Sequence, residues 1–206
     1  MRNVYAATTN MKRSAEPMPI LIPALLLMTA PMQVATAETQ GALVDLTAAR
    51  ASLTGNWEGS LEYLDYGANK WFGIPVKTRI EDQSDGATTI RRSDFDDGPT
   101  VGNVRITSVE LFDAAAGTVT SGTFRKGKEV SVETYAARMD GVAKDAAHWT
   151  MVEEVKAEDD SRPAILRLTT TRDGDSLETL KQVDYLDDDK QDWISRNRTR
   201  LTRVAG

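Results

Sequence analysis

The sequence contains no cysteine and a single histidine, His148, among its 206 residues. The lack of cysteine excludes disulfides, thiolate metal sites, iron–sulfur clusters and a cysteine nucleophile. One histidine cannot build a multi-histidine metal centre, and we expect His148 to lie at the surface or rim of the fold. We therefore expect no metal site and no cofactor.

Acidic residues outnumber basic ones, since the chain has 25 lysines and arginines and 31 aspartates and glutamates. The phosphate backbone of a nucleic acid requires a basic surface, so we expect no nucleic-acid partner. Long hydrophobic runs are missing as well. Residues 20–28 form an apolar run that falls short of the about 20 residues needed to span a bilayer.

That short apolar run has the flanks of a secretory signal peptide. Lys12 and Arg13 precede it, and the small-residue pattern Ala35-Thr36-Ala37 follows it. We predict a signal peptide over residues 1–37, a mature start near Glu38, and a domain over residues 38–206. The protein is then periplasmic or secreted, with no membrane span after cleavage and no cysteine to carry a lipid. Translation could start at Met1 or at Met11.

Most of the remaining sequence has the alternating apolar and polar pattern of β-strands. Residues 41–53 are the one helical stretch, because apolar residues recur there at three- and four-residue spacing. After it, apolar and polar residues alternate, and Asp-Gly pairs such as Asp173-Gly174 mark tight hairpins. The alternation predicts strands over residues 57–63, 72–81, 88–95, 104–112, 118–125, 129–138, 148–156, 164–172, 177–185 and 193–203.

Consecutive hairpins with no crossover helices favour an antiparallel sheet. An open sheet would leave two long edges exposed, whereas a closed barrel has none. We therefore predict an all-β fold, an antiparallel up-and-down barrel of about 8–10 strands with one short N-terminal helix. A sandwich of two sheets is the alternative.

The segment Gly55-Asn56-Trp57, placed after a short helix at the start of the first strand, resembles the G-x-W motif of the calycin superfamily. The likeness is closest to small exported bacterial lipocalin-like barrels. The resemblance implies that Trp57 packs at the closed end of the barrel under an arginine of the last strand, Arg198 or Arg200. Alternation along that strand instead places Arg198 and Arg200 outside, facing Glu62 of the first strand.

Several strand residues are candidates for a ligand pocket. Aromatic side chains inside an open-mouthed barrel would grip an apolar ligand. A glutamate among apolar neighbours would have a raised pKa or a basic partner, and Arg167 on the next strand could pair with Glu153. The same two residues could equally form an outward cross-strand pair. The candidates for ligand binding are Tyr63, Tyr135, Trp149, Glu153, Arg167 and Tyr185.

Three functions fit these observations. The first is an exported barrel that binds a small apolar or amphipathic molecule. The second is a cofactor-free enzyme of isomerase or cyclase type that uses Glu153 and Arg167 inside the cavity. The third is a barrel with a solid core that serves as an envelope or interaction protein. The sequence has no serine elbow, phosphate loop, dinucleotide fingerprint or metalloprotease motif, and this absence favours binding over catalysis.

Overall fold

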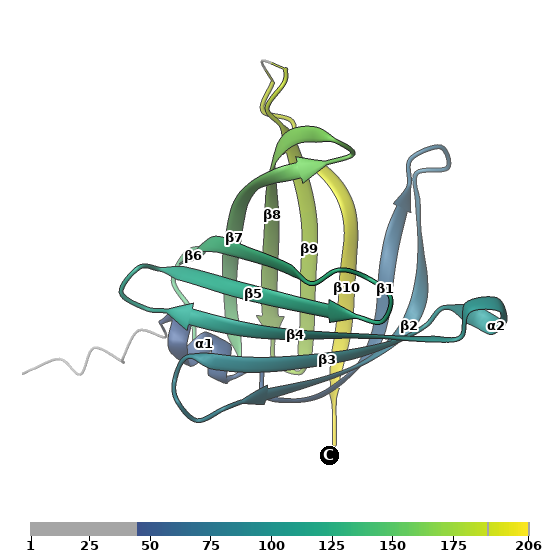
Figure 1. Cartoon of the computed structure of the whole chain (residues 1–206). Coiled ribbons are helices and arrows are strands. Elements are labelled where there is room, and N and C mark those ends of the chain that lie inside the picture. The colour runs from purple at the N-terminus through teal and green to yellow at the C-terminus, as the bar shows by residue number, and fades with distance from the viewer. Residues whose placement is uncertain (1–44, 189, 206) are drawn as a thin grey trace, which may run out of the picture. The chain divides into compact units, whose positions relative to one another are not determined.

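Ten antiparallel strands close into a barrel in the computed structural model of the protein, which describes residues 45–188 and 190–205 (Figure 1). The predicted fold class is confirmed, and the predicted signal peptide lies outside the described residues. The strands are β1 (Gly55–Asp65), β2 (Lys70–Asp82), β3 (Thr88–Asp96), β4 (Asn103–Asp113), β5 (Thr118–Arg125), β6 (Ser131–Met139), β7 (His148–Asp159), β8 (Arg162–Asp173), β9 (Ser176–Tyr185) and β10 (Ile194–Val204).

Each strand pairs with the next one along the chain, and the first pairs with the last. The β1–β10 seam runs in register from Asn56 opposite Val204 to Tyr63 opposite Asn197. This seam leaves no open sheet edge in the described barrel, as expected for a closed hairpin series. In Figure 1, strands β3–β6 run across the direction of β7–β10, so the two halves of the barrel cross at a steep angle.

Pro75 lies within β2, opposite Ser60 of β1, without a register shift between those two strands. Pairing between β2 and β3 starts only at Val76. Pro75 is therefore paired on one side of β2 only, and it makes no bulge against β1. A residue without an N–H is tolerated where the strand has one neighbour instead of two.

The predicted helix is present but short. Helix α1 spans Leu46–Ala51, and the Asp45 side chain caps it by accepting a hydrogen bond of 2.9 Å from the N–H of Ala48. A second helix of one turn, α2 (Gly98–Val101), lies in the β3–β4 connection where only a turn was predicted. No helix in residues 45–188 and 190–205 is long and apolar enough to cross a membrane.

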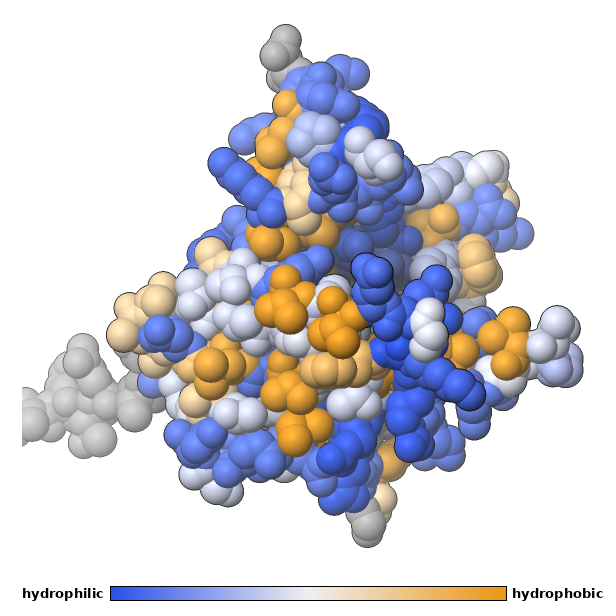
Figure 2. Space-filling view, in the orientation of Figure 1, coloured by the Kyte–Doolittle hydropathy of each residue, from blue (hydrophilic) through white to orange (hydrophobic). Residues whose placement is uncertain are grey.

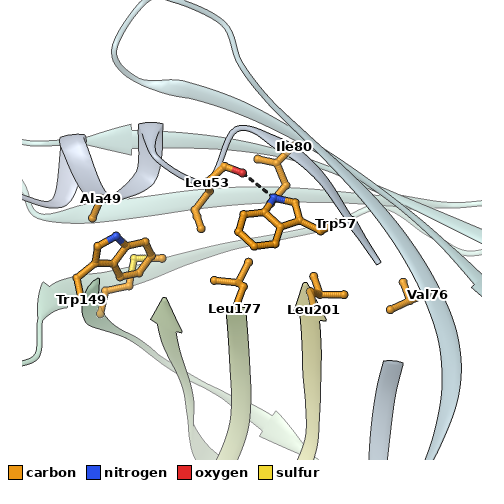
Figure 3. Close-up of a cluster of buried hydrophobic side chains, with 9 residues drawn as sticks. Ala49, Leu53, Trp57, Val76, Ile80, Trp149, Leu177 and Leu201 are labelled. Carbon is orange, nitrogen blue, oxygen red and sulfur yellow. Dashed lines mark hydrogen bonds between the residues drawn. The ribbon is translucent and has the colours of Figure 1, made fainter. Parts of the chain in front are cut away.

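Helix α1 covers one end of the barrel, which we call the floor. Trp57 is fully buried there and its indole N–H donates to the carbonyl of Leu53 at 2.8 Å (Figure 3). Trp149 packs in the same cluster, with 4% of its surface exposed. The buried members of the floor cluster are Ala49, Leu53, Trp57, Val76, Ile80, Trp149, Met151, Leu177 and Leu201.

An arginine of the last strand does cover Trp57, but it is Arg203. Its guanidinium carbon lies 4.3 Å from the centre of a Trp57 ring, and its terminal nitrogens donate to the carbonyls of Ser52 and Thr54. A Cβ on Gly55, whose φ is +143°, would lie 2.4 Å from this guanidinium, so a glycine is needed there. The assignment of Arg198 or Arg200 to the floor is wrong.

Arg198 and Arg200 both lie on the outer face of β10. Arg198 donates to Glu62 at 2.6 Å, and Arg200 lies 3.3 Å from Glu178. The period-two alternation explains this placement, because inward residues of β10 such as Leu201 share a face with Arg203. The outward orientation predicted from alternation was therefore correct for both residues.

Candidate functional site

A cavity of about 240 Å³ lies inside the barrel, above the floor cluster. Its lining is mainly polar, with two arginines, two glutamates, one tyrosine and six hydroxyl side chains beside three apolar ones. A second space of about 190 Å³ shares Arg91, Ser108 and Thr199 with it. The lining residues of the cavity are Arg50, Arg91, Ser108, Glu110, Val119, Ser121, Thr123, Tyr135, Met151, Glu153, Leu168, Thr170, Thr179 and Thr199.

Arg50 projects from helix α1 into this cavity and joins two carboxylates from opposite parts of the barrel. Its Nη2 donates to Glu110 of β4 at 2.5 Å, and its Nη1 donates to Glu153 of β7 at 3.1 Å. Only 5% of the Arg50 surface is exposed, and its Nε has no hydrogen-bond partner among the described residues. Buried charge-assisted hydrogen bonds therefore connect helix α1, which covers the floor, to strands β4 and β7 of the cavity wall.

The pKa values of the two carboxyl groups are shifted in opposite directions. Burial works against ionisation of Glu110, but the charges of Arg91 and Arg50 outweigh it and lower the Glu110 pKa. Burial raises the pKa of Glu153, and the charge of Arg50 does not compensate, because the nearby Glu110 opposes a second anion. Both arginines act on each carboxyl group, but Arg91 has the stronger influence on Glu110 and Arg50 the stronger influence on Glu153. The two shifts therefore favour ionisation of Glu110 over ionisation of Glu153.

Arg91 is the cavity arginine with donors available to a ligand. It projects inward from β3, and its nearest carboxylate oxygen, on Glu110, lies 3.8 Å away, beyond hydrogen-bonding distance. Its side chain borders both internal spaces. This part of the cavity therefore suits an anionic group.

Tyr135 also lines the cavity, and its hydroxyl donates to Glu133, the neighbour that shares its face of β6. Burial, reinforced by the Glu133 carboxylate, raises the pKa of Tyr135 well above its ordinary value. The phenol thus stays protonated at neutral pH. Because its one O–H is donated to Glu133, the hydroxyl oxygen can accept a hydrogen bond from a ligand.

The structure brings two of the six predicted ligand-binding residues, Tyr135 and Glu153, into the cavity. Trp149 belongs to the floor, where its indole N–H donates to the carbonyl of Ala146 at 3.1 Å. Tyr63 lies near the other end of β1, is 38% exposed, and stacks on Phe72 with ring centres 5.7 Å apart. These two aromatic residues do not line the cavity.

Tyr185 lies outside the cavity lining in a separate apolar cluster with Ala164, Leu166 and Val183. Its hydroxyl donates to Asp159 at 3.0 Å, and the guanidinium carbon of Arg162 lies 3.6 Å from its ring centre. Tyr185 therefore stabilises the far end of β7–β9 and contributes no surface to the cavity.

The pairing of Glu153 with Arg167 is wrong. Glu153 faces the interior opposite Leu168, whereas Arg167 is on the outer face opposite Glu154. Arg167 donates to Glu154 at 2.6 Å and stacks on the Trp193 ring at 3.5 Å. Alternation along β8 places Arg167 and Leu168 on opposite faces, so an inward Glu153 cannot meet Arg167.

Three functional candidates, Arg50, Arg91 and Glu110, were missed by sequence reasoning. The sequence pattern could have indicated all three, because each is a charged residue at a position where its helix or strand otherwise carries inward-facing side chains. Arg50 lies four residues after Leu46 on the apolar side of the helix. Glu110 shares the inward face of β4 with Ser108 and Phe112. A charge in the apolar register of its element indicates an internal partner.

His148 lies at the start of β7, and its Nδ1 is 2.7 Å from Asp145. Its side chain is partly exposed, in agreement with a surface position. In the part of the chain that the structure describes, no group of three or more His, Cys, Asp or Glu residues could hold a metal ion.

The opposite pKa shifts of Glu110 and Glu153 predict that replacing each by glutamine changes the pH dependence of stability in opposite directions. Since the folded pKa of Glu153 is raised above its ordinary value of 4.5, its contribution to stability is full below that pH and is lost as the pH rises. The contribution of Glu110, whose folded pKa is lowered, is present above pH 4.5 and is lost as the pH falls. Each unit of pKa difference corresponds to about 1.4 kcal/mol.

We therefore expect Glu153→Gln to gain stability relative to the wild type as the pH rises from 4 to 8. Glu110→Gln is expected to lose stability relative to the wild type over the same range. Urea unfolding at several pH values measures both trends. Parallel profiles for the two variants would contradict the opposite pKa shifts of Glu110 and Glu153.

Comparison with solved structures matches the barrel to "Crystal Structure of Rv2717c from M. tuberculosis". The match has a TM-score of 0.53 and 13% sequence identity, and it covers 79% of this chain and 99% of that chain. At this identity the likeness shows the fold alone. No family model matches the sequence, and no curated protein matches it.

Proposed function

We propose that this protein is an exported, lipocalin-like barrel that binds a small amphipathic molecule through an anionic group held at Arg91. The observation that supports this function is the internal cavity, into which Arg91 presents donors that make no hydrogen bond to a carboxylate of the described residues. Arginine binds carboxylates and similar oxyanions through parallel N–H donors. The hydroxyl groups of Ser108 and Thr199, which border the same space, can complete the shell around such a group.

The polarity and size of the cavity narrow the ligand class. A wholly apolar ligand would leave the lining arginines and hydroxyls without partners, which costs free energy. A volume of about 240 Å³ lies just below the usual range of about 300–1,000 Å³ for drug-sized ligands, which favours a small molecule. Burial raises the pKa of Glu153, and its protonated form can donate a hydrogen bond to an oxyanion, whereas its ionised form would repel the oxyanion.

The two other functions have less support. The cofactor-free enzyme required Glu153 and Arg167 to face each other inside the barrel, and they lie on opposite faces of the sheet. The interaction protein required a solid core, and the barrel contains internal space. Binding is therefore the function that the geometry favours.

Arg91→Met is expected to weaken the binding of an anionic amphiphile by about 10- to 100-fold. A hydrogen bond to a charged group contributes about 1.5–3 kcal/mol, and about 1.4 kcal/mol corresponds to a factor of ten. The probe is a fluorescent short-chain carboxylate, displaced by octanoate or by octanol, with binding followed by fluorescence. The matched control is Arg92→Met, because Arg92 is the next residue of β3, faces outward and pairs with Glu81.

Three results would contradict the proposal. One is equal displacement by octanoate and octanol, the second is equal affinity of the Arg91→Met and wild-type proteins, and the third is no binding of either compound. Export is tested separately by expressing the full chain in a bacterium and sequencing the N-terminus of the periplasmic product. A start at Glu38 is expected, and retention of residues 1–37 in the cytoplasm would overturn this part of the proposal.

A further inference from the structure

The outer face of β4–β6 carries exposed apolar side chains that the barrel itself does not use. Between 37% and 65% of the surface of each of these residues is exposed. Figure 2 shows hydrophobic residues gathered over these strands, on the side of the barrel that faces the viewer. We call this surface the apolar face, and it consists of Val109, Leu111, Phe124, Val130 and Val132.

The strand register explains why these residues lie together. Val109 of β4, Gly122 of β5 and Val132 of β6 are direct neighbours across the three strands. Phe124 lies two residues after Gly122 on the same face of β5, and a Cβ on Gly122 would contact its ring at 3.6 Å. The apolar face is therefore a continuous surface and not a set of scattered side chains.

The end of the apolar face is basic. The β5–β6 turn contains Arg125, Lys126 and Lys128 against one acidic residue, Glu129, and every residue from Phe124 to Val130 is exposed. This concentration of positive charge contrasts with the whole chain, in which acidic residues outnumber basic ones. Exposed aromatic and aliphatic side chains beside lysine and arginine are the combination that binds the interface of anionic bilayers.

We propose that the apolar face and the basic β5–β6 turn dock this protein on the surface of an anionic lipid bilayer. The three cations of the turn contact lipid phosphates, while Phe124 and Val132 enter the headgroup region. Charge complementarity favours this partner over a second copy of the chain. A second copy would present the same face, whose basic turn lacks the carboxylates needed to neutralise the first copy's cations.

Vesicle sedimentation tests the docking surface with the purified mature domain and no added ligand. We expect binding to vesicles of phosphatidylglycerol and phosphatidylcholine to be at least tenfold stronger than to pure phosphatidylcholine, and to fall as salt rises. Lys126→Glu with Lys128→Glu should weaken this binding at least tenfold, and Phe124→Ser with Val132→Ser should weaken it severalfold. The matched control is Lys156→Glu with Lys190→Glu, since both lysines are exposed and lie away from the apolar face.

Circular dichroism and thermal melting of each variant separate a loss of docking from a loss of folding. Equal binding to neutral and anionic vesicles, or no binding to either, would overturn the proposal. It would also be overturned if sedimentation velocity showed a dimer that Phe124→Ser with Val132→Ser disrupts, because a second copy would then cover the apolar face. The Arg91→Met variant should dock as the wild type does, so a failure of cavity binding and a failure of docking are distinguishable.

Discussion

Replacing Trp57 by alanine is expected to lower the free energy of unfolding by about 3–5 kcal/mol. Trp57 is fully buried at the centre of the floor cluster, and its indole N–H satisfies the carbonyl of Leu53 at 2.8 Å. The substitution would leave a cavity, an unpaired buried carbonyl and no ring beneath the Arg203 guanidinium. Urea unfolding monitored by circular dichroism measures the change.

Trp193→Ala is the matched control for this prediction. Trp193 is only half-buried, and it packs against the Arg167 guanidinium on the outer side of the barrel. An exposed contact between a cation and an aromatic ring contributes about 1 kcal/mol or less. Similar losses for the two variants would show that the floor cluster does not dominate the stability of the barrel.

Arg50→Met is expected to cost about 3–5 kcal/mol at neutral pH, because it leaves the buried Glu110 and Glu153 without their shared cation. The apolar stem of methionine can still fill much of the space of the arginine stem. Without Arg50, the folded pKa values of both carboxyls should be raised. The variant should therefore recover stability as the pH falls toward 4, since protonation removes the buried charge.

A triple variant tests whether buried charge is the cause of that loss. Arg50→Met combined with Glu110→Gln and Glu153→Gln removes the cation and both carboxylates, so we expect it to be more stable at pH 7 than Arg50→Met alone. Urea unfolding at pH 5 and pH 7 gives the comparison. A loss that stays constant with pH and is not reduced in the triple variant would indicate a packing defect instead.

The fold could be predicted because its determinants are local. Alternation of apolar and polar residues gave the strands, and Asp-Gly pairs such as Asp173-Gly174 gave the turns, since both signals act within a few residues. Antiparallel pairing followed from the absence of crossover helices, and closure followed from the two exposed edges that an open sheet would leave. The position of α1 was predicted as well, although its start and end were not, because caps such as Asp45 decide those boundaries.

The candidate site was predicted less well, because its contacts join residues far apart in the chain. The Arg50–Glu153 and Arg50–Glu110 bonds depend on which side chains face inward and on the length of the arginine side chain. Alternation fixes the face of a residue relative to its strand, and it correctly placed Arg198 and Arg200 outside. It cannot say which cation reaches a given carboxylate. Alternation places Arg203 on the face opposite to Arg198 and Arg200, but it does not reveal the strand register that sets Arg203 directly opposite Trp57.

The seam between β1 and β10 has a consequence for the kinetics of folding. Its partners, such as Asn56 and Val204, come from opposite ends of the described chain, so every residue between them must be available before the seam can form. Contacts of such long range slow folding, because loop closure costs entropy before any contact is gained. Until β10 arrives, β1 and β9 each keep an unpaired edge. In a chain that emerges from a ribosome or a translocation pore N-terminus first, β1 can pair with β2 early, but its β10-facing edge stays unpaired for most of the synthesis. Chaperone binding to that edge is the expected safeguard against aggregation.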